Sequence, residues 1–201
     1  MAGLPDPSLL KEIEYRAVEM ARETGLFLTE SQMTPGTVEY KGRGRSSPVT
    51  PADREAEERL RRSIQQRFPG HSILGEEGEV VGSDGAPFLW VLDPLDGTSN
   101  FIGRLAVFAV SVGVLYEGVP VAAALFLPAS SGNGGRVYHA RRDGGAFAEE
   151  QPIAVASLAT PEDGRLVAFP AHYGRRFGCR QRCGADGARC GTWAASPTRW
   201  P

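Results

Sequence analysis

Apolar side chains recur at helical spacing in two stretches near the N-terminus. The first stretch follows Asp6-Pro7, and its apolar positions lie three and four residues apart, at Leu10, Ile13, Ala17, Met20 and Ala21. In the second stretch the apolar positions repeat every four residues up to Pro69-Gly70, at Ala52, Ala56, Leu60, Ile64 and Phe68. Both patterns predict an amphipathic helix that presents one apolar face to a core.

Strand signals dominate the middle of the chain. Residues 105–115 and 119–127 are rich in β-branched and apolar side chains, and Tyr116-Glu117-Gly118 joins them into a predicted hairpin. A shorter apolar run at 88–92 predicts a buried strand that Pro94 would end, because proline has no backbone donor. Further strand residues are expected at 137–140, at 146–147 and from 166 to 169. Together the elements predict an α+β layer in which helices cover an antiparallel sheet.

Two aspartates follow the run at 88–92 and add candidate chemistry. Asp93 stands where that strand should end, and Asp96 follows three residues later, just before Gly97-Thr98. On a turning backbone both carboxylates can face one point, where a cation or protons would relieve their repulsion. Asp-Pro-Leu-Asp-Gly is also an ordinary turn sequence, because aspartate, proline and glycine are the residues that turns prefer. These five residues alone leave both interpretations open.

Two upstream segments supply further acidic residues. The apolar approach Ile73-Leu74-Gly75 ends in Glu76-Glu77-Gly78, although glutamates beside glycines are usually solvated loop residues. Thr50-Pro51-Ala52-Asp53 opens the second predicted helix, with Thr50 as N-cap and Asp53 at the third position, as in a capping box. Taken alone, Asp53 is therefore interpreted as a capping residue.

Taken together, these three segments resemble the inositol monophosphatase family, whose pattern pairs Gly-Glu-Glu with Asp-Pro-Leu/Ile-Asp-Gly-Thr-x-Asn-Phe. The resemblance extends from about Leu9 to about Tyr173 and includes residues 108–113 and the turn at 144–147. It implies a layered α/β sandwich of the sugar-phosphatase type, in which a second α/β layer follows the first.

The resemblance also implies a set of metal ligands. Glu76, Asp93 and the main-chain carbonyl of Leu95 would hold a first Mg²⁺, while Asp93 and Asp96 would hold a second. The choice of Glu76 over Glu77 comes from the family pattern, in which the first glutamate coordinates. The family's remaining ligand is an aspartate in a Trp-Asp motif of the second layer, and no residue of this chain matches it.

The same resemblance implies a reaction. Asp53 and Thr98 would orient a metal-activated water for in-line attack on a phosphate monoester, without a covalent phosphoenzyme. Asp96 and the amides of Gly97 and Thr98 would contact the substrate phosphate. The implied activity is a Mg²⁺-dependent phosphomonoesterase acting on inositol monophosphate or a related sugar, histidinol or nucleotide phosphate. Full-length relatives are commonly homodimers and often inhibited by Li⁺.

Spacing argues against other phosphate and metal sites. The acids at Asp93 and Asp96 are three apart, whereas phosphatases with an aspartyl nucleophile place them two apart. A helix-loop-helix calcium site needs acids at alternating positions, which are absent here. The basic stretch 41–47 lacks Gly-Lys-Ser/Thr, so it predicts a loop rather than a P-loop, and Lys41 matches a family loop lysine only loosely.

Composition sets outer limits on the function. The 201 residues, of which 41% are hydrophobic, suffice for one large or two small globular domains. A net charge of -2 gives no case for binding nucleic acid. The N-terminus lacks a signal pattern, and no apolar stretch is long enough to span a bilayer, so a cytoplasmic protein without membrane partners is expected.

The C-terminal segment departs abruptly from the family pattern. Residues 174–201 contain no Leu, Ile, Val or Met, but six Arg, five Gly and all three Cys, so they cannot build a core. The cysteine spacing predicts neither a zinc site nor a disulfide framework. We therefore expect an N-terminal metal-binding phosphatase layer at 1–155, the start of a second layer at 156–173 and an aberrant, disordered tail at 174–201.

This organisation predicts a frameshifted or truncated form of a longer protein, with the second layer largely missing. Loss of one metal ligand should disturb the attack geometry, so the activity of the chain is expected to be weak. The alternative is a catalytically inactive fragment that binds metal or phosphate, or that interacts with another protein.

Overall fold

The computed structural model describes residues 5–34, 36–41, 47–76, 80–83, 85–128, 134–155, 169–170 and 192–193. The chain divides into two compact units, Met1–Ile153 and Ala154–Pro201. In the second unit two short strands, β11 (Phe169–Pro170) and β12 (Thr192–Trp193), pair in parallel. The expectations for the cysteines and most of the C-terminal segment lie outside the described residues. Within the described part, no helix is long and apolar enough to cross a membrane.

Both predicted long helices are confirmed. Helix α1 (Pro7–Ser31) starts at Asp6, whose side chain accepts a hydrogen bond from the Ser8 N–H over 2.7 Å. Helix α2 (Pro51–Arg67) starts at Thr50 with a complete capping box, in which the side chains of Thr50 and Asp53 bond each other's backbone N–H. The N-cap side chains and the prolines at the first helical position explain where each helix begins.

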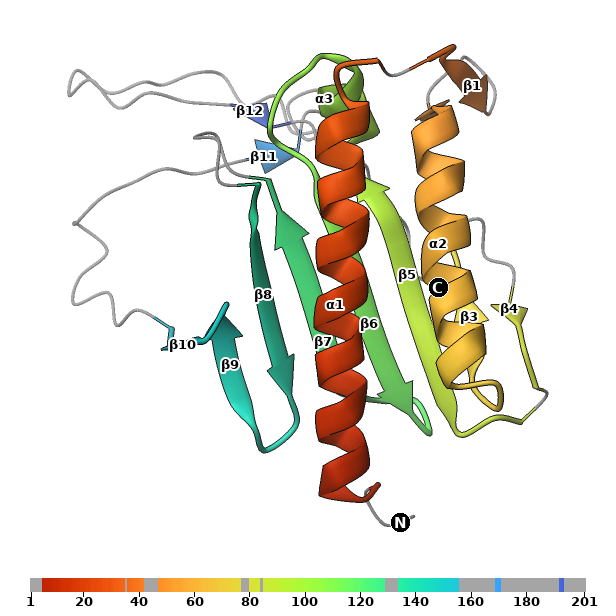
Figure 1. Ribbon diagram of the computed structural model, residues 1–201, viewed down its shortest axis with the longest axis vertical. Coiled ribbons are helices and arrows are strands. Elements are labelled where there is room, and N and C mark those ends of the chain that lie inside the picture. Colours follow the sequence, from red (N-terminus) through yellow and green to blue (C-terminus); the bar gives the residue numbers. More distant parts are fainter. Residues whose placement is uncertain are drawn as a thin grey trace. The chain divides into compact units, whose positions relative to one another are not determined.

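An eight-stranded sheet forms the body of the first unit. Its order is β10-β9-β8-β7-β6-β5-β3-β4, and of these neighbours only β3 and β5 run parallel. The strands are β3 (Ser72–Leu74), β4 (Val80–Val81), β5 (Phe88–Asp96), β6 (Ala109–Tyr116), β7 (Val119–Leu127), β8 (Arg136–Arg141), β9 (Gly145–Ala148) and β10 (Gln151–Ile153). A separate antiparallel pair joins β1 (Glu39–Lys41) to β2 (Ser47–Val49). Helices α1 and α2 lie side by side across one face of the sheet (Figure 1).

The predicted hairpin is confirmed, but two strand boundaries differ from prediction. The first hairpin strand begins at Ala109 rather than at 105, because helix α3 (Thr98–Ile102) and its loop take up the preceding residues. Strand β5 does not end at Pro94 but continues to Asp96. Its register with β6 shifts between Asp93 and Asp96, so Pro94 lies in a bulge where no ladder donor is needed.

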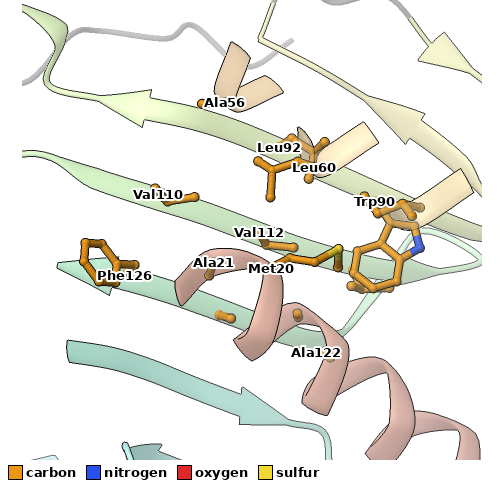
Figure 2. Close-up of a cluster of buried hydrophobic side chains, with 14 of the residues drawn as sticks. Met20, Ala21, Ala56, Leu60, Trp90, Leu92, Val110, Val112, Ala122 and Phe126 are labelled. Atoms are coloured by element: carbon orange, nitrogen blue, oxygen red, sulfur yellow. The ribbon is translucent and has the colours of Figure 1, made fainter. Parts of the chain in front are cut away.

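The core lies between the two helices and the sheet. Large side chains of the central strands point toward the helices and are almost completely buried, among them Trp90, Leu92, Val110, Val112 and Phe126 (Figure 2). The contact with α1 is close, since a Cβ on Gly25 would lie 2.1 Å from the Phe126 ring. Along β5 the intervening residues Leu89, Val91 and Asp93 are only partly buried. Strand alternation places Asp93 on the sheet face opposite the helices.

Candidate functional site

Asp93 is a carboxylate in an environment that opposes its ionisation. Its Oδ1 is buried and has no hydrogen-bond partner among the described residues. Burial, followed by the negative charges of Asp96, Glu76 and Asp53, raises the pKa of Asp93 to about 7, although the Leu95 N–H partly offsets this. An electron-rich oxygen without a partner, surrounded by like charges, is suited to bind a cation.

Strand β3 brings a second acid toward Asp93. It pairs with β5 in parallel, and Leu74 lies opposite Val91. Glu76 follows Leu74 by two residues, as Asp93 follows Val91, and its charge is among those that act on the Asp93 carboxylate. Glu76 is exposed, which leaves it accessible to an ion at the strand end. Glu77, the other glutamate of the segment, lies outside the described residues.

Gly97 makes the turn from β5 into α3. Its φ of 85° lies in the left-handed region, and a Cβ there would lie 3.0 Å from the Val107 carbonyl oxygen, so glycine is needed. The Asn100 side-chain amide donates to that same carbonyl over 2.9 Å. These constraints fix the backbone from the exposed Asp96 to Thr98, the first residue of α3.

Asp53 connects the start of α2 with the start of α3. Its Oδ2 accepts hydrogen bonds from the N–H and hydroxyl of Thr50 at 2.7 and 2.5 Å. Its Oδ1 lies 3.2 Å from the Thr98 hydroxyl, which is also 3.1 Å from the Leu95 carbonyl oxygen. Thr98 has one hydroxyl proton for these two acceptors. When the hydroxyl donates its hydrogen bond to Asp53 Oδ1, the Leu95 carbonyl oxygen can accept from another donor or bind an ion.

Gln32 is a supporting residue that the sequence analysis did not identify. It is buried at the end of α1, and its side-chain amide donates to the carbonyls of Phe101 and Leu105 over 3.3 and 3.0 Å. Gln32 thereby ties α1 to the segment that follows Thr98. A glutamine near a helix end carries no sequence signal for such a contact, because its partners lie 69 and 73 residues away.

The predicted site residues fall into two groups. Asp53, Thr98 and Leu95 make direct contacts, whereas Asp93, Glu76 and Asp96 are related by the charges that act on Asp93. In the described part of the chain no three His, Cys, Asp or Glu side chains are already placed to hold a metal ion. The donors are all oxygens, as Mg²⁺ prefers, and the orphaned Asp93 Oδ1 fits such an ion.

Comparison with known proteins gives consistent results. The sequence model of the inositol monophosphatase family matches residues 9–177. The chloroplastic phosphatase IMPL1 of Arabidopsis thaliana is 37% identical over 168 residues, which cover 82% of this chain and 44% of that protein. An inositol-1-monophosphatase of Rhizobium meliloti is 37% identical over 134 residues, covering 66% of this chain and 48% of that protein.

A solved structure shows the same architecture. The inositol monophosphatase of Anabaena (Nostoc) aligns with a TM-score of 0.66 and 30% identity, covering 84% of this chain and 58% of that one. The α+β fold seen here is therefore the fold of the matched part of that protein. The chain spans about half the length of the curated relatives it matches.

Proposed function

The chain belongs to the inositol monophosphatase family, and on that basis we propose that the acidic residues at the end of β5 form part of the active site of a Mg²⁺-dependent phosphomonoesterase. Its substrate would be a small phosphorylated metabolite, such as inositol monophosphate or a related sugar, histidinol or nucleotide phosphate. The observation that carries the proposal is the Asp93 carboxylate, whose buried Oδ1 has no hydrogen-bond partner among the described residues and on which the charges of three further acids act.

Four residues would hold the metal. Glu76, Asp93 and the Leu95 carbonyl would bind one Mg²⁺, and Asp93 and Asp96 a second. When bound, Mg²⁺ would lower the pKa of a coordinated water and offset the charge of the phosphate oxygens. The proposal is supported by the oxygen-only donor set and by the charges of Asp96 and Glu76, which act on Asp93 and raise its pKa.

The remaining residues would handle the proton and the phosphate. Thr98 Oγ1 donates toward Asp53 Oδ1, so a water bound to the hydroxyl could pass a proton through Thr98 to Asp53. The N–H groups of Gly97 and Thr98, together with Asp96, would contact the phosphate. Helix α3 has only five residues, so the individual N–H groups, rather than a helix dipole, would supply this contribution.

The test is phosphate release by the 201-residue chain from inositol 1-phosphate, histidinol phosphate and adenosine 3′,5′-bisphosphate, with and without Mg²⁺. Calorimetric titration with Mg²⁺ on the same samples separates binding from turnover. Mg²⁺-dependent release that Asp93→Asn abolishes supports the proposal. Mg²⁺ binding without release supports the inactive metal-binding alternative, and equal Mg²⁺ affinity in Asp93→Asn overturns the site. Light scattering would test the homodimer that the family membership suggests.

A further inference from the structure

Gly75, the residue between β3 and Glu76, lies against two side chains of α2. A Cβ on Gly75 would lie 2.2 Å from Oε1 of Glu57 and 2.4 Å from Nη2 of Arg61. At such distances the two side chains already fill the space that a larger residue would need. Gly75 itself is buried. The carboxylate and the guanidinium therefore rest directly on the backbone that leads into Glu76.

Glu57 and Arg61 form an ion pair within one turn of α2. Oε1 of Glu57 accepts from Nε of Arg61 at 2.9 Å and lies 2.8 Å from its Nη2. The two side chains are 22% and 16% exposed, whereas those of the next pair, Glu58 and Arg62, are 59% and 62% exposed. An exposed pair of this kind contributes little, while a packed pair with two contacts keeps its geometry.

The pair lies on the helix face that already serves the site. Glu57 follows Asp53 by four residues, so both point to the same side of α2. Asp53 reaches Thr98 after β5, and Glu57 reaches Gly75 after β3. One helix thus contacts both of the segments that carry candidate site residues.

We propose that the Glu57–Arg61 pair positions the backbone at Gly75 and thereby directs the Glu76 side chain toward Asp93. The inference rests on the proposed function, since it assigns Glu76 a metal to bind. Arg61 has a second role, because Glu57 alone would place an uncompensated negative charge against the backbone that leads into Glu76. The paired guanidinium lets the carboxylate support Gly75 without that uncompensated charge.

The first test measures Mn²⁺ affinity by electron paramagnetic resonance, with Mg²⁺ as competitor, on the full 201-residue chain. Glu57→Ala and Arg61→Met should each weaken binding about tenfold or more, as losses of ligand-supporting groups do. The matched controls are Glu58→Ala and Arg62→Met on the same helix, which should leave binding unchanged. Equal Mn²⁺ affinities in the unmodified chain and all four variants overturn the inference. It is also overturned if the variants lose affinity only in proportion to a fall in their thermal unfolding midpoint.

The second test uses the steric contact. Gly75→Ala should weaken Mn²⁺ binding, because the new methyl group displaces the tips of Glu57 and Arg61 or moves the Glu76 backbone. The double variant Gly75→Ala/Glu57→Ala should bind no worse than Glu57→Ala alone, since the Arg61 guanidinium is then no longer held by Glu57 and can move away from the new methyl group. If the fold-loss of Mn²⁺ affinity in the double variant equals the product of the two single losses, the proposal is contradicted.

A metal-free measurement separates this inference from the proposed function. If the unmodified chain binds no Mn²⁺, the proposed function fails, but the amide resonances of Gly75 and Glu76 still report the contact. Their displacement in Glu57→Ala, and not in Glu58→Ala, supports the positioning pair. Unchanged resonances overturn it whatever the metal does.

Discussion

The Thr98 hydroxyl lies 3.2 Å from Oδ1 of Asp53, and this contact joins the first turn of α2 to the first turn of α3. Asp53 is buried, and its other oxygen is already occupied by Thr50. A capping interaction and a candidate proton path therefore share one carboxylate. The capping function and the site function of Asp53 are compatible, because they use different oxygen atoms.

The Thr98→Val substitution tests how much this contact contributes to the free energy of unfolding. The substitution keeps the shape of the side chain but removes the donor to Asp53 Oδ1 and to the Leu95 carbonyl. The expected loss is about 1 kcal/mol in the free energy of unfolding, as for one part-buried hydrogen bond. Urea denaturation followed by tryptophan fluorescence gives the number. Ser99→Ala, at the exposed neighbouring position, is the control and should stay within about 0.5 kcal/mol of the unchanged protein.

Asp93→Asn should make the metal-free protein more stable in alkaline solution. The pKa of Asp93 is about 7 in the folded chain, against 3.8 for an ordinary aspartate, so the folded state binds more protons between these values. The contribution of this carboxyl to the free energy of unfolding is therefore fully present below the unfolded pKa of 3.8. It is lost as the pH rises through the folded pKa of about 7. Asparagine removes this loss, which is on the order of 2–4 kcal/mol at about pH 8.

The measurement is urea denaturation of both proteins in chelator at several pH values. Exposed Asp143→Asn serves as the control and should give a curve parallel to that of the unchanged chain. Added Mg²⁺ should stabilise the protein with Asp93 and not the variant. Identical pH dependence in all three proteins would show that Asp93 ionises as an ordinary surface carboxyl.

The sequence was most informative where local chemistry decides the structure. Capping by Asp6 and Thr50 and the apolar repeats of α1 and α2 predicted both helices, because their causes lie within a few residues. Pro94 misled the strand prediction, since a missing donor ends a regular ladder but is tolerated in a bulge. Whether a bulge forms depends on the register with β6, which no local pattern encodes.

The candidate site shows the same division. The motif around Asp93 supplied the residue types, and the family resemblance supplied their roles. Asp53 contacts Thr98, Gln32 contacts the segment that follows it, and the Glu57–Arg61 pair contacts Gly75, although these residues are distant in sequence. Such contacts depend on how α1 and α2 lie across the sheet, so periodicity and spacing alone do not reveal them.

Glu14→Gln should destabilise the protein far more than Glu19→Gln does. Glu14 is 7% exposed, and its two oxygens lie 2.8 Å from His139 Nδ1 and 2.9 Å from Arg141 Nε, so it ties α1 to β8. Removing a buried carboxylate that contacts a histidine ring and pairs with an arginine should cost about 2–4 kcal/mol in the free energy of unfolding.

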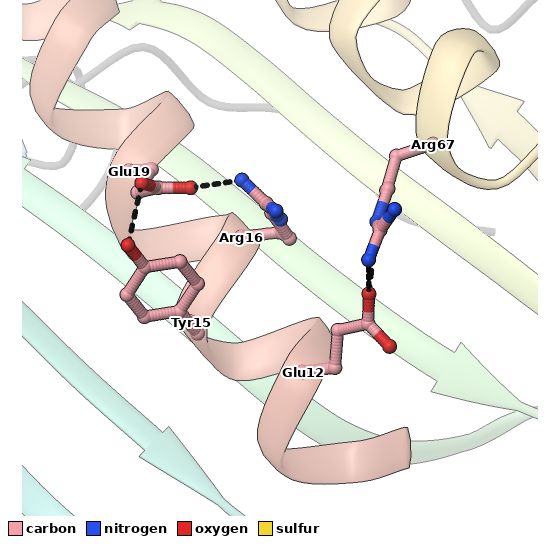
Figure 3. A network of polar contacts seen from close by, with 5 residues as sticks. All are labelled: Glu12, Tyr15, Arg16, Glu19 and Arg67. Atoms are coloured by element: carbon pink, nitrogen blue, oxygen red, sulfur yellow. Dashed lines mark hydrogen bonds and ion pairs between the residues drawn. The ribbon is translucent and has the colours of Figure 1, made fainter.

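Glu19 is the matched control on the same helix. It accepts from Tyr15 and Arg16 at the surface, near the Arg67–Glu12 pair that links α2 to α1 (Figure 3). Exposed contacts of this kind are worth well under about 1 kcal/mol. Urea denaturation of both variants makes the comparison, and equal losses would contradict a structural role for the buried Glu14 network.

Below neutral pH, the change in the free energy of unfolding with pH should come in part from His71. Its ring stacks on Phe68 and Phe88, and its Nδ1 accepts a hydrogen bond over 3.0 Å from Nε1 of the buried Trp90. Burial lowers the pKa of His71 from its usual 6.5, so between the folded and unfolded values the unfolded chain binds more protons. The stability that neutral His71 contributes is therefore complete above 6.5 and is lost as the pH falls through the lower, folded value.

Two variants separate the acceptor of His71 from its charge. His71→Phe leaves the Trp90 N–H without its partner and should cost about 1–3 kcal/mol near pH 7.5, with a smaller cost in acid. His71→Gln keeps an acceptor that does not titrate, so its cost should be smaller near neutrality. The difference in free energy of unfolding between the unchanged chain and each variant, measured in urea from about pH 5 to 7.5, cancels the other titrating groups. A difference that stays constant over this range would show that His71 is as readily protonated in the folded chain as in the unfolded one.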